Sequence, residues 1–510
     1  MSRINTNISS LTAQRVLGEN NFKLSTALER LSTGLQISRG KDDPAGLIAS
    51  ENLRSELSAL DAAVGNGTRA DQVINIAEGG LQEISNSLTE LQGLLTQSAN
   101  AAGLSDDEKD ANQLQIDSIL QTIDRLSGST SFQGTKLLNG SFDYQVTSVD
   151  SAVTDFQVNG AKFETATQDV TAIVSQSAQK AGLFLGLGTS TTGGSATIDL
   201  ASGSAFSIEV VGSLGSRELS FSSAQTLTQI ATAINAFTEV TGVTASVSGY
   251  GVKLTSSEYG SDEYVSVKVN GGNLTDNSSG GEFGVYQLAS GDFNAVTGSA
   301  TTFANAANPV RDSGQDIAGT INGIVATGSG RDLSINTDFL DVEFTLDETQ
   351  SQTLGTVAAF TITGGGADFQ LASDVNVNGK VSIGIQDIAT RKLGRSDLGF
   401  LDDLASGKAY SVTKSDANFS QAQKIVDQAI KQVSATRGRL GAFQKNVIGT
   451  TVRNLGVTVE NTAAAESAIR DTDFAKETAN LTRNQILVQA STQALALANA
   501  QPQAVLSLLG

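Results

Sequence analysis

Three residue types that supply much of enzyme chemistry are missing from this 510-residue chain, which contains no Cys, no His and no Trp. Their absence excludes a histidine-dependent catalytic triad, a thiolate nucleophile, a His/Cys zinc site and a haem ligand. Disulfide bonds are excluded for the same reason. Catalysis by carboxylates alone stays open, but no motif supports it. We therefore predict no enzymatic activity and no cofactor.

Basic charge and long apolar runs are also scarce. The chain has 33 Lys and Arg against 53 Asp and Glu, a formal net charge of -20 and a pI of about 4.4. So acidic a chain is expected to bind neither nucleic acid nor an anionic membrane. No run of about 18 apolar residues exists, so we expect no membrane insertion. The N-terminus, MSRINTNISSLTAQRV, lacks the apolar core of a signal peptide.

A spacing of seven residues organises the N-terminal part of the chain. Leu17, Leu24 and Leu31 predict a helix with an apolar seam, interrupted by the sequence GKDDPAG at 40–46. Asp42 or Asp43 is expected to cap the next helix, with Pro44 in its first turn. That helix should run from 47 to about 99, and Gly67 leaves a gap in its otherwise unbroken seven-step line: Leu53, Leu60, Ile74, Leu81, Leu88 and Leu95.

Three further helices are predicted. Residues 105–108 form a Ser-x-x-Glu capping box, and the helix that follows should end at Gly128. Between 419 and 450, apolar residues alternate in steps of three and four without a slip, through Val447 and Thr450. The C-terminal stretch from 463 has a seven-step seam and an uncharged apolar tip: Phe474, Leu481, Val488, Leu495, Leu506 and Leu509. Because long helices need packing partners, we expect the two ends of the chain to form one bundle.

The middle of the chain has a different composition. From about 137 to 400 it is rich in Gly, Ser, Thr and Val with period-two alternation, which predicts strands. Leu137 to Gly140 is interpreted as a hairpin turn, 206–269 as a strand–helix–strand module, and 369–385 as strands that rejoin the hairpin. The predicted fold class is α+β, with long N- and C-terminal helices forming a coiled-coil or helical-bundle core and a β-rich inserted variable domain.

Both ends of the chain carry specific motifs. LSTGLQISRGKDDPAGLIAS at 31–50 is similar to the N-terminal signature of bacterial flagellins. AAESAIRDTDFAKETANLTRNQILVQAS at 464–491 and QPQAVLSLL at 501–509 are similar to their C-terminal signature. Residues 216–269 resemble the small repeat in the variable region of longer flagellins. The resemblance implies a structural subunit that is secreted by flagellar type III export and polymerises helically into an extracellular filament for swimming motility.

The resemblance also implies a layered organisation. Residues 1–42 and 466–510 would form an inner coiled coil, and 43–150 with 366–465 an outer helical core with a β-hairpin. Residues 151–365 would form a β-rich variable surface domain, with the small repeat at about 206–269. Arg39, Asp42 and Asp43 would set the geometry between the inner and outer layers. The expected assembly residues all lie in the two ends: Ile4, Ile8, Leu11, Leu24, Leu31, Phe474, Leu481, Ile486, Val488, Leu495, Leu506 and Leu509.

Further partners follow from the same resemblance: other copies of the chain, a flagellar export chaperone, and cap and hook-associated proteins. Sugars could be O-linked to the Ser- and Thr-rich surface of 150–365. Many flagellins are sensed by a Toll-like receptor through a stretch similar to 88–97, where Leu88, Leu94 and Gln97 fit the pattern. Glu90 replaces a usual basic residue and Gly93 a usual Glu, so we predict weakened receptor activation.

Two alternative functions stay open at this point. A flagellar hook–filament junction protein shares the N-terminal pattern, but usually lacks so complete a C-terminal match as NLTRNQILVQAS. An extracellular adhesive or carbohydrate-active protein anchored by flagellin-like ends is the second alternative. It would need an acidic pair in a cleft or an aromatic platform within 150–365, where aromatic residues are sparse.

Overall fold

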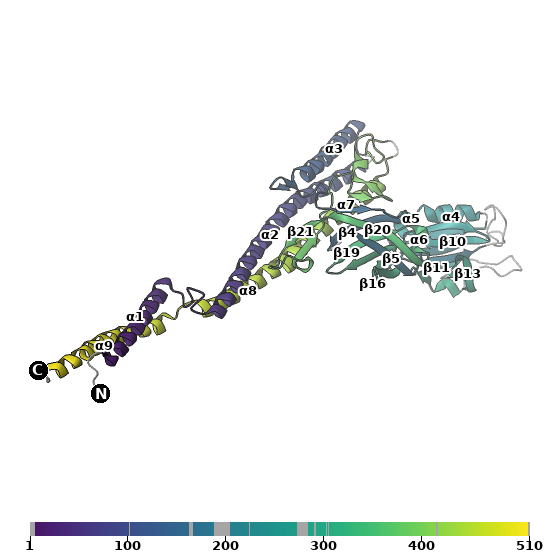
Figure 1. Cartoon of the computed structure of the whole chain (residues 1–510). Helices are drawn as coiled ribbons and strands as arrows, with labels where there is room; N and C mark the ends of the chain where they lie inside the picture. Colours follow the sequence, from purple (N-terminus) through teal and green to yellow (C-terminus); the bar gives the residue numbers. More distant parts are fainter. Residues whose placement is uncertain are drawn as a thin grey trace. The chain divides into compact units, whose positions relative to one another are not determined.

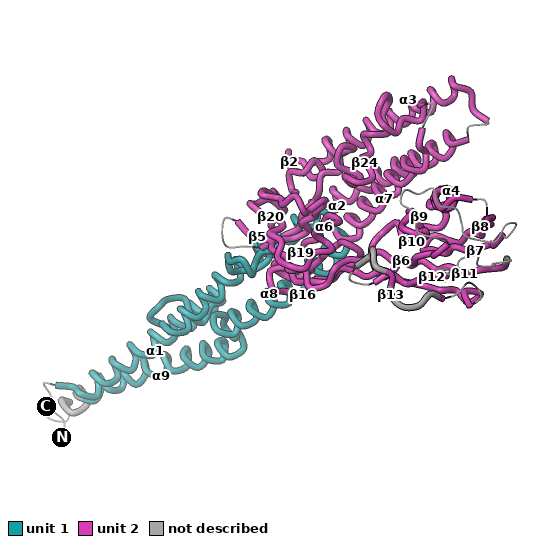
Figure 2. Tube along the Cα trace, turned by 90° about the vertical axis from the view of Figure 1, so that its right-hand side faces the viewer, with its two compact units in different colours: residues 1–74, 369–381, 440–510 teal, residues 75–368, 382–439 magenta. Residues whose placement is uncertain are grey.

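The computed structural model describes residues 6–100, 103–162, 167–187, 205–223, 225–272, 284–289, 292–301, 303, 305–414 and 417–507. The chain divides into two compact units (Figure 2). Residues 1–74, 369–381 and 440–510 form the first unit, which contains both ends of the chain. Residues 75–368 and 382–439 form the second unit.

In the first unit, α1 (Ile8–Thr33) and α9 (Phe474–Ser507) lie side by side in antiparallel directions (Figure 1). The Asn7 side chain caps α1 by accepting a hydrogen bond from the N–H of Ser10. Gly34, with a φ of +73°, ends it. The prediction that this helix extends to residue 40 was therefore wrong, because the left-handed glycine stops it earlier.

The segment after α1 pairs with the segment before α9. Leu35 and Asp471 form an isolated antiparallel bridge, so Leu35 does not belong to the helical seam. The N–H of Gln36 donates to the carbonyl of Arg470 at 2.7 Å, and the N–H of Thr472 donates to the carbonyl of Gly34 at 2.9 Å. The two chain segments are thus fixed to each other at the base of the α1–α9 pair.

Helix α2 (Pro44–Ser98) begins where the sequence predicts. Asp43 Oδ1 accepts hydrogen bonds from the N–H groups of Ala45 at 3.1 Å and Gly46 at 3.0 Å, which confirms the cap. In the first unit, α2 packs on α8 (Gly449–Arg470) through a small apolar cluster: Leu60, Ala63, Val64, Leu455 and Val459.

The helix α7 (Phe419–Ala442) continues through a π-helical turn, η4 (Phe443–Ile448), into α8, and a line of buried apolar side chains follows all three. The predicted stripe through Val447 and Thr450 was wrong beyond α7, since Val447 is half-buried and Thr450 exposed. The fully buried side chains instead follow steps of seven, eight and seven: Val433, Leu440, Ile448 and Leu455. The wider turn of η4 accommodates the additional residue.

In the second unit, α2, α3 (Asp106–Ser129) and α7 form a helical bundle (Figure 1). The predicted capping box of Ser105 and Glu108 is present. The predicted end at Gly128 was wrong, because α3 continues to Ser129 with Thr130 as its C-cap. Gln92 of α2 donates to Asp427 of α7 at 2.7 Å. The side chains of the bundle core are buried: Leu81, Ile84, Leu88, Leu91, Leu95, Ile116, Leu120, Ile123, Val426, Ala429 and Val433.

Short strands and turns follow the bundle. The hairpin consists of β1 (Ser131–Phe132) and β2 (Thr135–Lys136), with a Gln133-Gly134 turn at φ of +48° and +86°. The prediction of the turn at 137–140 was therefore wrong. The expectation that residues near 385 rejoin this region is confirmed, because Ile385 N–H donates to the carbonyl of Phe142 at 2.9 Å. Nearby elements are β23 (Gly394–Arg395), β24 (Gly399–Phe400) and η3 (Leu401–Leu404).

Two sheets with a shared apolar core form what we call the first β lobe. One has the order β16-β15-β5-β20-β3 and the other β17-β18-β19-β4, with α6 (Glu348–Ser351) beside them. The strands are β3 (Tyr144–Thr147), β4 (Val153–Ala161), β5 (Gln168–Gln176), β15 (Ala318–Ile321), β16 (Ile324–Val325), β17 (Thr327–Ser329), β18 (Asp332–Asn336), β19 (Leu340–Leu346) and β20 (Gly355–Gly365).

The second β lobe is an insertion within the first. Its sheets have the orders β13-β12-β6-β10-β9 and β14-β11-β7-β8, with α4 (Leu227–Asn235), α5 (Thr238–Thr241) and η1 (Asn305–Ala307). The strand–helix–strand prediction for 206–269 is confirmed, with β8 and β10 in addition. The strands are β6 (Gly182–Gly186), β7 (Ala205–Gly212), β8 (Ser216–Ser222), β9 (Val243–Ser248), β10 (Gly251–Ser256), β11 (Tyr264–Gly272), β12 (Gly284–Ala289), β13 (Asp292–Thr301) and β14 (Val310–Ser313).

A separate pair of strands follows the first lobe. β21 (Ala367–Gln370) and β22 (Lys380–Ile383) pair with each other, with η2 (Val377–Gly379) before β22. In the first unit, the carbonyl of Gln370 accepts a hydrogen bond from Asn66 of α2 at 3.2 Å. The predicted strands at 369–385 are thus partly confirmed.

Candidate functional site

Small and polar residues form the seam between α1 and α9. Ser10, Asn20 and Ser491 are 8%, 7% and 9% exposed. Among the described side chains of these two helices, the only buried apolar ones are Ala27 and Ala498. The predicted seam leucines are only half-buried: Leu17, Leu24, Leu31, Leu481 and Leu495. The pair therefore buries little apolar surface within one copy of the chain.

Hydrogen bonds between side chains connect the two helices along the seam. Asn20 Nδ2 donates to Ser491 Oγ at 2.7 Å, and Ser491 Oγ donates to the carbonyl of Leu487 at 2.6 Å. Near the chain ends, Ser10 Oγ donates to Asn499 Oδ1 at 2.7 Å. These residues were not predicted, because apolar periodicity does not mark single polar residues, although Asn20 lies three residues from Leu17.

Large apolar side chains project outward from the same two helices. Ile8, Phe22 and Leu497 are 63%, 63% and 70% exposed. We call the exposed set the outer apolar face: Ile8, Leu11, Val16, Phe22, Leu28, Phe474, Ile486, Leu487 and Leu497. Several large exposed apolar side chains on one pair of helices are typical of a protein–protein contact.

The predicted assembly residues divide between the seam and this face. Ile8, Leu11, Phe474 and Ile486 belong to the outer apolar face, whereas Val488 is half-buried like the seam leucines. Ile4 and Leu509 lie outside the described residues. Leu506 lies in α9, but its side chain is outside the described part.

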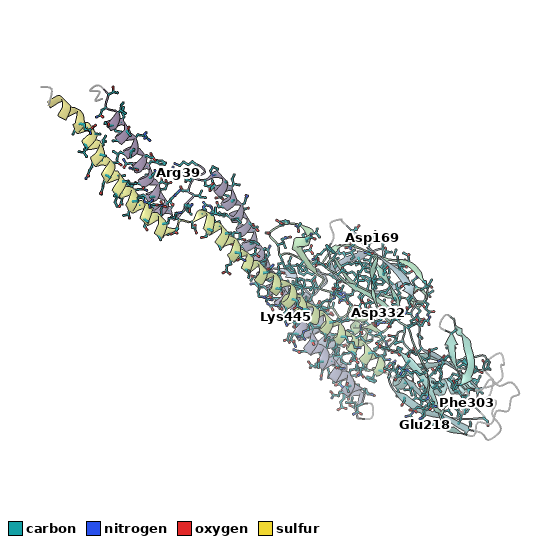
Figure 3. All side chains as sticks on the ribbon, turned by 90° about the horizontal axis from the view of Figure 1, so that it is seen from below. Arg39, Asp169, Glu218, Phe303, Asp332 and Lys445 are labelled. Carbon is teal, nitrogen blue, oxygen red and sulfur yellow. The ribbon has the colours of Figure 1, made fainter. Side chains whose placement is uncertain are left out.

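The segment between α1 and α2 is held by charged side chains (Figure 3, where Arg39 is labelled). The Arg39 guanidinium lies 2.8 Å from the Glu29 carboxylate, an ion pair that the sequence analysis did not identify. Asp42 accepts hydrogen bonds from the N–H of Arg39 and the hydroxyl of Ser38. Removal of the Asp42 carboxylate from water raises its pKa. The hydrogen bonds outweigh this cause, so the pKa of Asp42 is lowered. Asp43 acts as the helix cap described above.

The predicted receptor stretch is only partly accessible. Glu90, Gly93 and Gln97 are exposed on α2, and Leu94 is half-buried. Leu88 is completely buried in the helical bundle, so it cannot contact a partner while the bundle is intact. The place of Leu88 on the seven-step line makes it a core residue, so the predicted receptor contact stays a prediction that depends on the exposed residues of this stretch.

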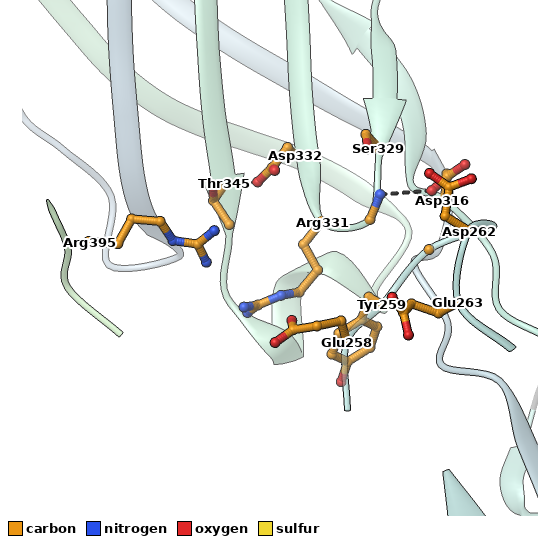
Figure 4. A pocket seen from close by; sticks show the side chains of 12 residues that line it. Glu258, Tyr259, Asp262, Glu263, Asp316, Ser329, Arg331, Asp332, Thr345 and Arg395 are labelled. Carbon is orange, nitrogen blue, oxygen red and sulfur yellow. Dashed lines mark hydrogen bonds between the residues drawn. The ribbon is translucent and has the colours of Figure 1, made fainter. Parts of the chain in front are cut away.

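A polar pocket of about 220 Å³ lies between the two β lobes (Figure 4). Asp316 accepts hydrogen bonds from the N–H groups of Ser261 and Gly330, and Lys180 and Arg331 lie over the ring of Tyr259. Burial raises the pKa of Asp316, but its hydrogen bonds outweigh burial and lower the pKa. A carboxyl group that stays ionised in this way favours a structural role over that of a general acid. These contacts connect the lobes.

The described residues contain neither a metal-binding cluster nor a membrane-spanning helix. No cluster of three or more metal-ligating side chains is present among them. The helices that the structure describes include none whose length and apolar character would allow it to cross a membrane.

Three family models match the chain. The bacterial flagellin N-terminal helical region matches residues 4–143, the C-terminal helical region matches 423–509, and the flagellin hook IN motif matches 205–258. The chain is 30% identical to a flagellin of Salmonella choleraesuis and 30% identical to the B-type flagellin of Pseudomonas aeruginosa. Each of these alignments covers 99% of both proteins.

Solved structures with similarity include FliC from Burkholderia pseudomallei, at 15% identity and a TM-score of 0.24, covering 74% of this chain and 99% of that one. The D2-D3 domains of the flagellar cap protein FliD from Escherichia coli match at 20% identity and a TM-score of 0.25, covering 43% of this chain and 97% of that one. The sequence matches, which span the whole chain, decide the assignment. The chain belongs to the bacterial flagellin family, structural proteins rather than enzymes, whose copies polymerise into the extracellular filament of the bacterial flagellum.

Proposed function

We propose that the outer apolar face of α1 and α9 is buried by the same helices of neighbouring copies, and that this burial drives polymerisation. The supporting observation is that the seam uses Ser, Asn and Ala, whereas the large apolar side chains project outward. Contacts between two different surfaces of identical subunits produce a helical filament when they do not close into a ring.

Burial of this face would contribute a substantial part of the free energy of assembly. Complete burial of one large apolar side chain contributes about 1.5–3 kcal/mol. Burial of four such side chains per subunit would therefore contribute about 6–12 kcal/mol before the entropy cost of association. Ile8, Leu11, Phe22 and Leu497 are each more than half exposed and are our main candidates.

Residues 1–42 and 466–510 are proposed as the inner layer of the filament. Residues 43–150 and 366–465 form the outer helical layer, and 151–365 the solvent-facing domain. The ion pair of Arg39 with Glu29, the hydrogen bonds of Asp42 in the turn and the helix cap of Asp43 support a fixed connection between the first two layers. β3 lies before residue 150 but pairs with β20, so the solvent-facing domain takes one strand from the adjoining layer.

Other partners are proposed for the same surfaces. An export chaperone, a cap protein and hook-associated proteins would bind the outer apolar face before or at the ends of the polymer. Sugars would be attached to exposed Ser and Thr of the β lobes. Weak activation of a Toll-like receptor is proposed from Glu90 and Gly93, both exposed on α2. Strong signalling by purified monomer in a receptor reporter assay would refute that part.

Substitution within the outer apolar face tests the main proposal. We expect Phe22→Ser and Leu497→Ser each to raise the critical concentration for polymerisation by about tenfold or more, measured by sedimentation. Leu214→Ser is the matched control, since Leu214 is 67% exposed but lies in the second β lobe. A chain lacking 496–510 should stay soluble and fail to polymerise. Normal filaments from that truncated chain would contradict the proposal.

A further inference from the structure

The apolar seam between α1 and α9 does not by itself define one alignment of the two helices. Leu17, Leu24 and Leu31 repeat every seven residues, and so do Leu481, Val488 and Leu495. A shift of one helix by seven residues, about 10.5 Å, would still place two of the three side chains on each helix opposite equivalent ones. Because both sets are only half-buried, the shift would cost little apolar contact.

A buried polar pair removes this ambiguity. Asn20 and Ser491 are 7% and 9% exposed, and Asn20 Nδ2 donates to Ser491 Oγ at 2.7 Å. Either shift by seven residues separates the pair. One shift places Ala498 opposite Asn20 and leaves its buried amide without a partner, whereas the other places Asn484 opposite Asn20 and Ala13 opposite Ser491. A buried amide without a partner is costly, whereas an apolar pair would tolerate the shift.

We propose that Asn20 and Ser491 are positioning residues that select the register of α1 against α9, and thereby align the outer apolar face for assembly. The inference rests on the proposed function, because the register matters only if both helices contribute to one surface. Phe22 and Ile486 lie on different helices, so a shifted register would change their relative position along the pair by about 10.5 Å. A neighbouring copy could then no longer contact both residues as before.

The chain offers a clean reporter of register because it contains no Cys. The side chains of Ser10 and Asn499 are hydrogen-bonded at 2.7 Å, so Ser10→Cys with Asn499→Cys reports the native register. Ser10→Cys with Thr492→Cys, or with Leu506→Cys, reports a shift of seven residues in either direction. The Ser10–Asn499 hydrogen bond is lost in all three Cys pairs, because each of them replaces Ser10, so its loss does not distinguish one pair from another.

Each Cys pair is tested in three full-length backgrounds: unchanged, Asn20→Leu with Ser491→Leu, and the exchange Asn20→Ser with Ser491→Asn. After oxidation, cross-linked chains are quantified on non-reducing gels. In the unchanged background, we expect Ser10→Cys with Leu506→Cys, which reports the shift that leaves Asn20 opposite Ala498, to cross-link at about a tenth of the native pair or less. In the Leu/Leu background, the cross-linked fraction of the shifted pairs should increase at least severalfold, and the filaments should become shorter. The exchange should restore the unchanged pattern.

The result separates this inference from the proposed function. The cross-linking pattern reports register whether or not filaments form, whereas Phe22→Ser and Leu497→Ser test burial between copies. If the Leu/Leu background cross-links only the native pair, the bridge of Leu35 and Asp471 sets the register and the inference is overturned. Loss of filaments with an unshifted pattern would equally overturn it, since Asn20 would then act between copies.

Discussion

Val452 of α8 occupies the space that a Cβ atom on Gly67 of α2 would need, because its Cγ2 would overlap that atom. The glycine that interrupts the seven-step line of α2 is therefore a point of close approach between two helices, within the first unit. An added methyl group there would force the helices apart or move Val452 from its position.

Gly67→Ala should consequently destabilise the first unit by about 1–3 kcal/mol, measured by chemical denaturation. Gly65→Ala is a matched control two residues away in the same helix, where a Cβ would meet nothing within 4 Å. That substitution should stabilise the helix by about 0.5–1 kcal/mol, because Ala is the better helix former. Equal effects of the two substitutions would contradict the close approach.

The π-helical turn η4 predicts an unusual tolerance to deletion. Removing the exposed Lys445 would let the segment close into a regular α-helix and would shorten the step from Leu440 to Ile448 from eight residues to seven. We expect the melting temperature to change by only a few degrees. Removing Thr458 from the regular part of α8 should be much more damaging, because every later side chain rotates by about 100°. Comparable losses in both variants would argue against this interpretation of η4.

Tyr144 makes the first β lobe sensitive to alkaline pH. Its hydroxyl accepts a hydrogen bond from the N–H of Ala161 at 2.9 Å, and burial is the main cause that raises the pKa of Tyr144 to about 12. The folded lobe therefore retains the phenolic proton more strongly than the unfolded chain does. Stability should fall as the pH rises from about 10 to 12.

Tyr144→Phe should remove this part of the alkaline transition, while costing about 1–3 kcal/mol at neutral pH because the Ala161 amide loses its partner. Unfolding free energies measured from pH 7 to 12 test both statements. If the variant loses stability above pH 10 as steeply as the unchanged chain, Tyr144 is not the responsible group.

A second pH dependence arises where α7 meets the first β lobe. The side-chain amide of Gln157 lies 2.6 Å from a guanidinium nitrogen of Arg439. Burial raises the pKa values of Asp143, Asp341 and Glu343, which surround this guanidinium. Since the folded pKa exceeds the unfolded one, stability falls as the pH rises from about 4 through the folded values.

Glu343→Gln should reduce this loss of stability, whereas Arg439→Gln should steepen it, because the carboxylates would lose a nearby positive charge. Thermal unfolding between pH 4 and 7 is the appropriate measurement. Glu348→Gln, on α6 and outside the cluster, controls for the change in net charge. An unchanged pH profile in Glu343→Gln would refute the assignment.

Sequence periodicity predicted the long helices well, for a physical reason. A rod such as α2 must bury one face along its whole length, so its seven-step line is visible without a structure. The sequence shows less clearly which residues along each helix are the buried ones. The step of eight between Leu440 and Ile448 looks like ordinary alternation of threes and fours, and both Gly134 and Gly140 have positive φ although only Gly134 lies in the hairpin turn.

The candidate site illustrates the same limit. Apolar periodicity identified α1 and α9, but it could not decide which stripe faces the partner helix and which faces outward. Asn20 and Ser491 mark the side of each helix that faces the other, because buried polar groups need hydrogen-bond partners. Single polar residues carry no periodic signal in the sequence. The sequence therefore indicated that the helices need partners, but not that the larger side chains, such as Phe22, are the ones left exposed.

Because the chain has no Trp, a single introduced indole can report whether the outer apolar face becomes buried. We would compare Phe22→Trp with Leu214→Trp as monomer and as polymer, recording the emission maximum and quenching by acrylamide. The account predicts that the indole at position 22 shifts to shorter wavelength and becomes protected on polymerisation, while the one at 214 does not. An indole at position 22 that is as exposed in the filament as in the monomer would contradict it.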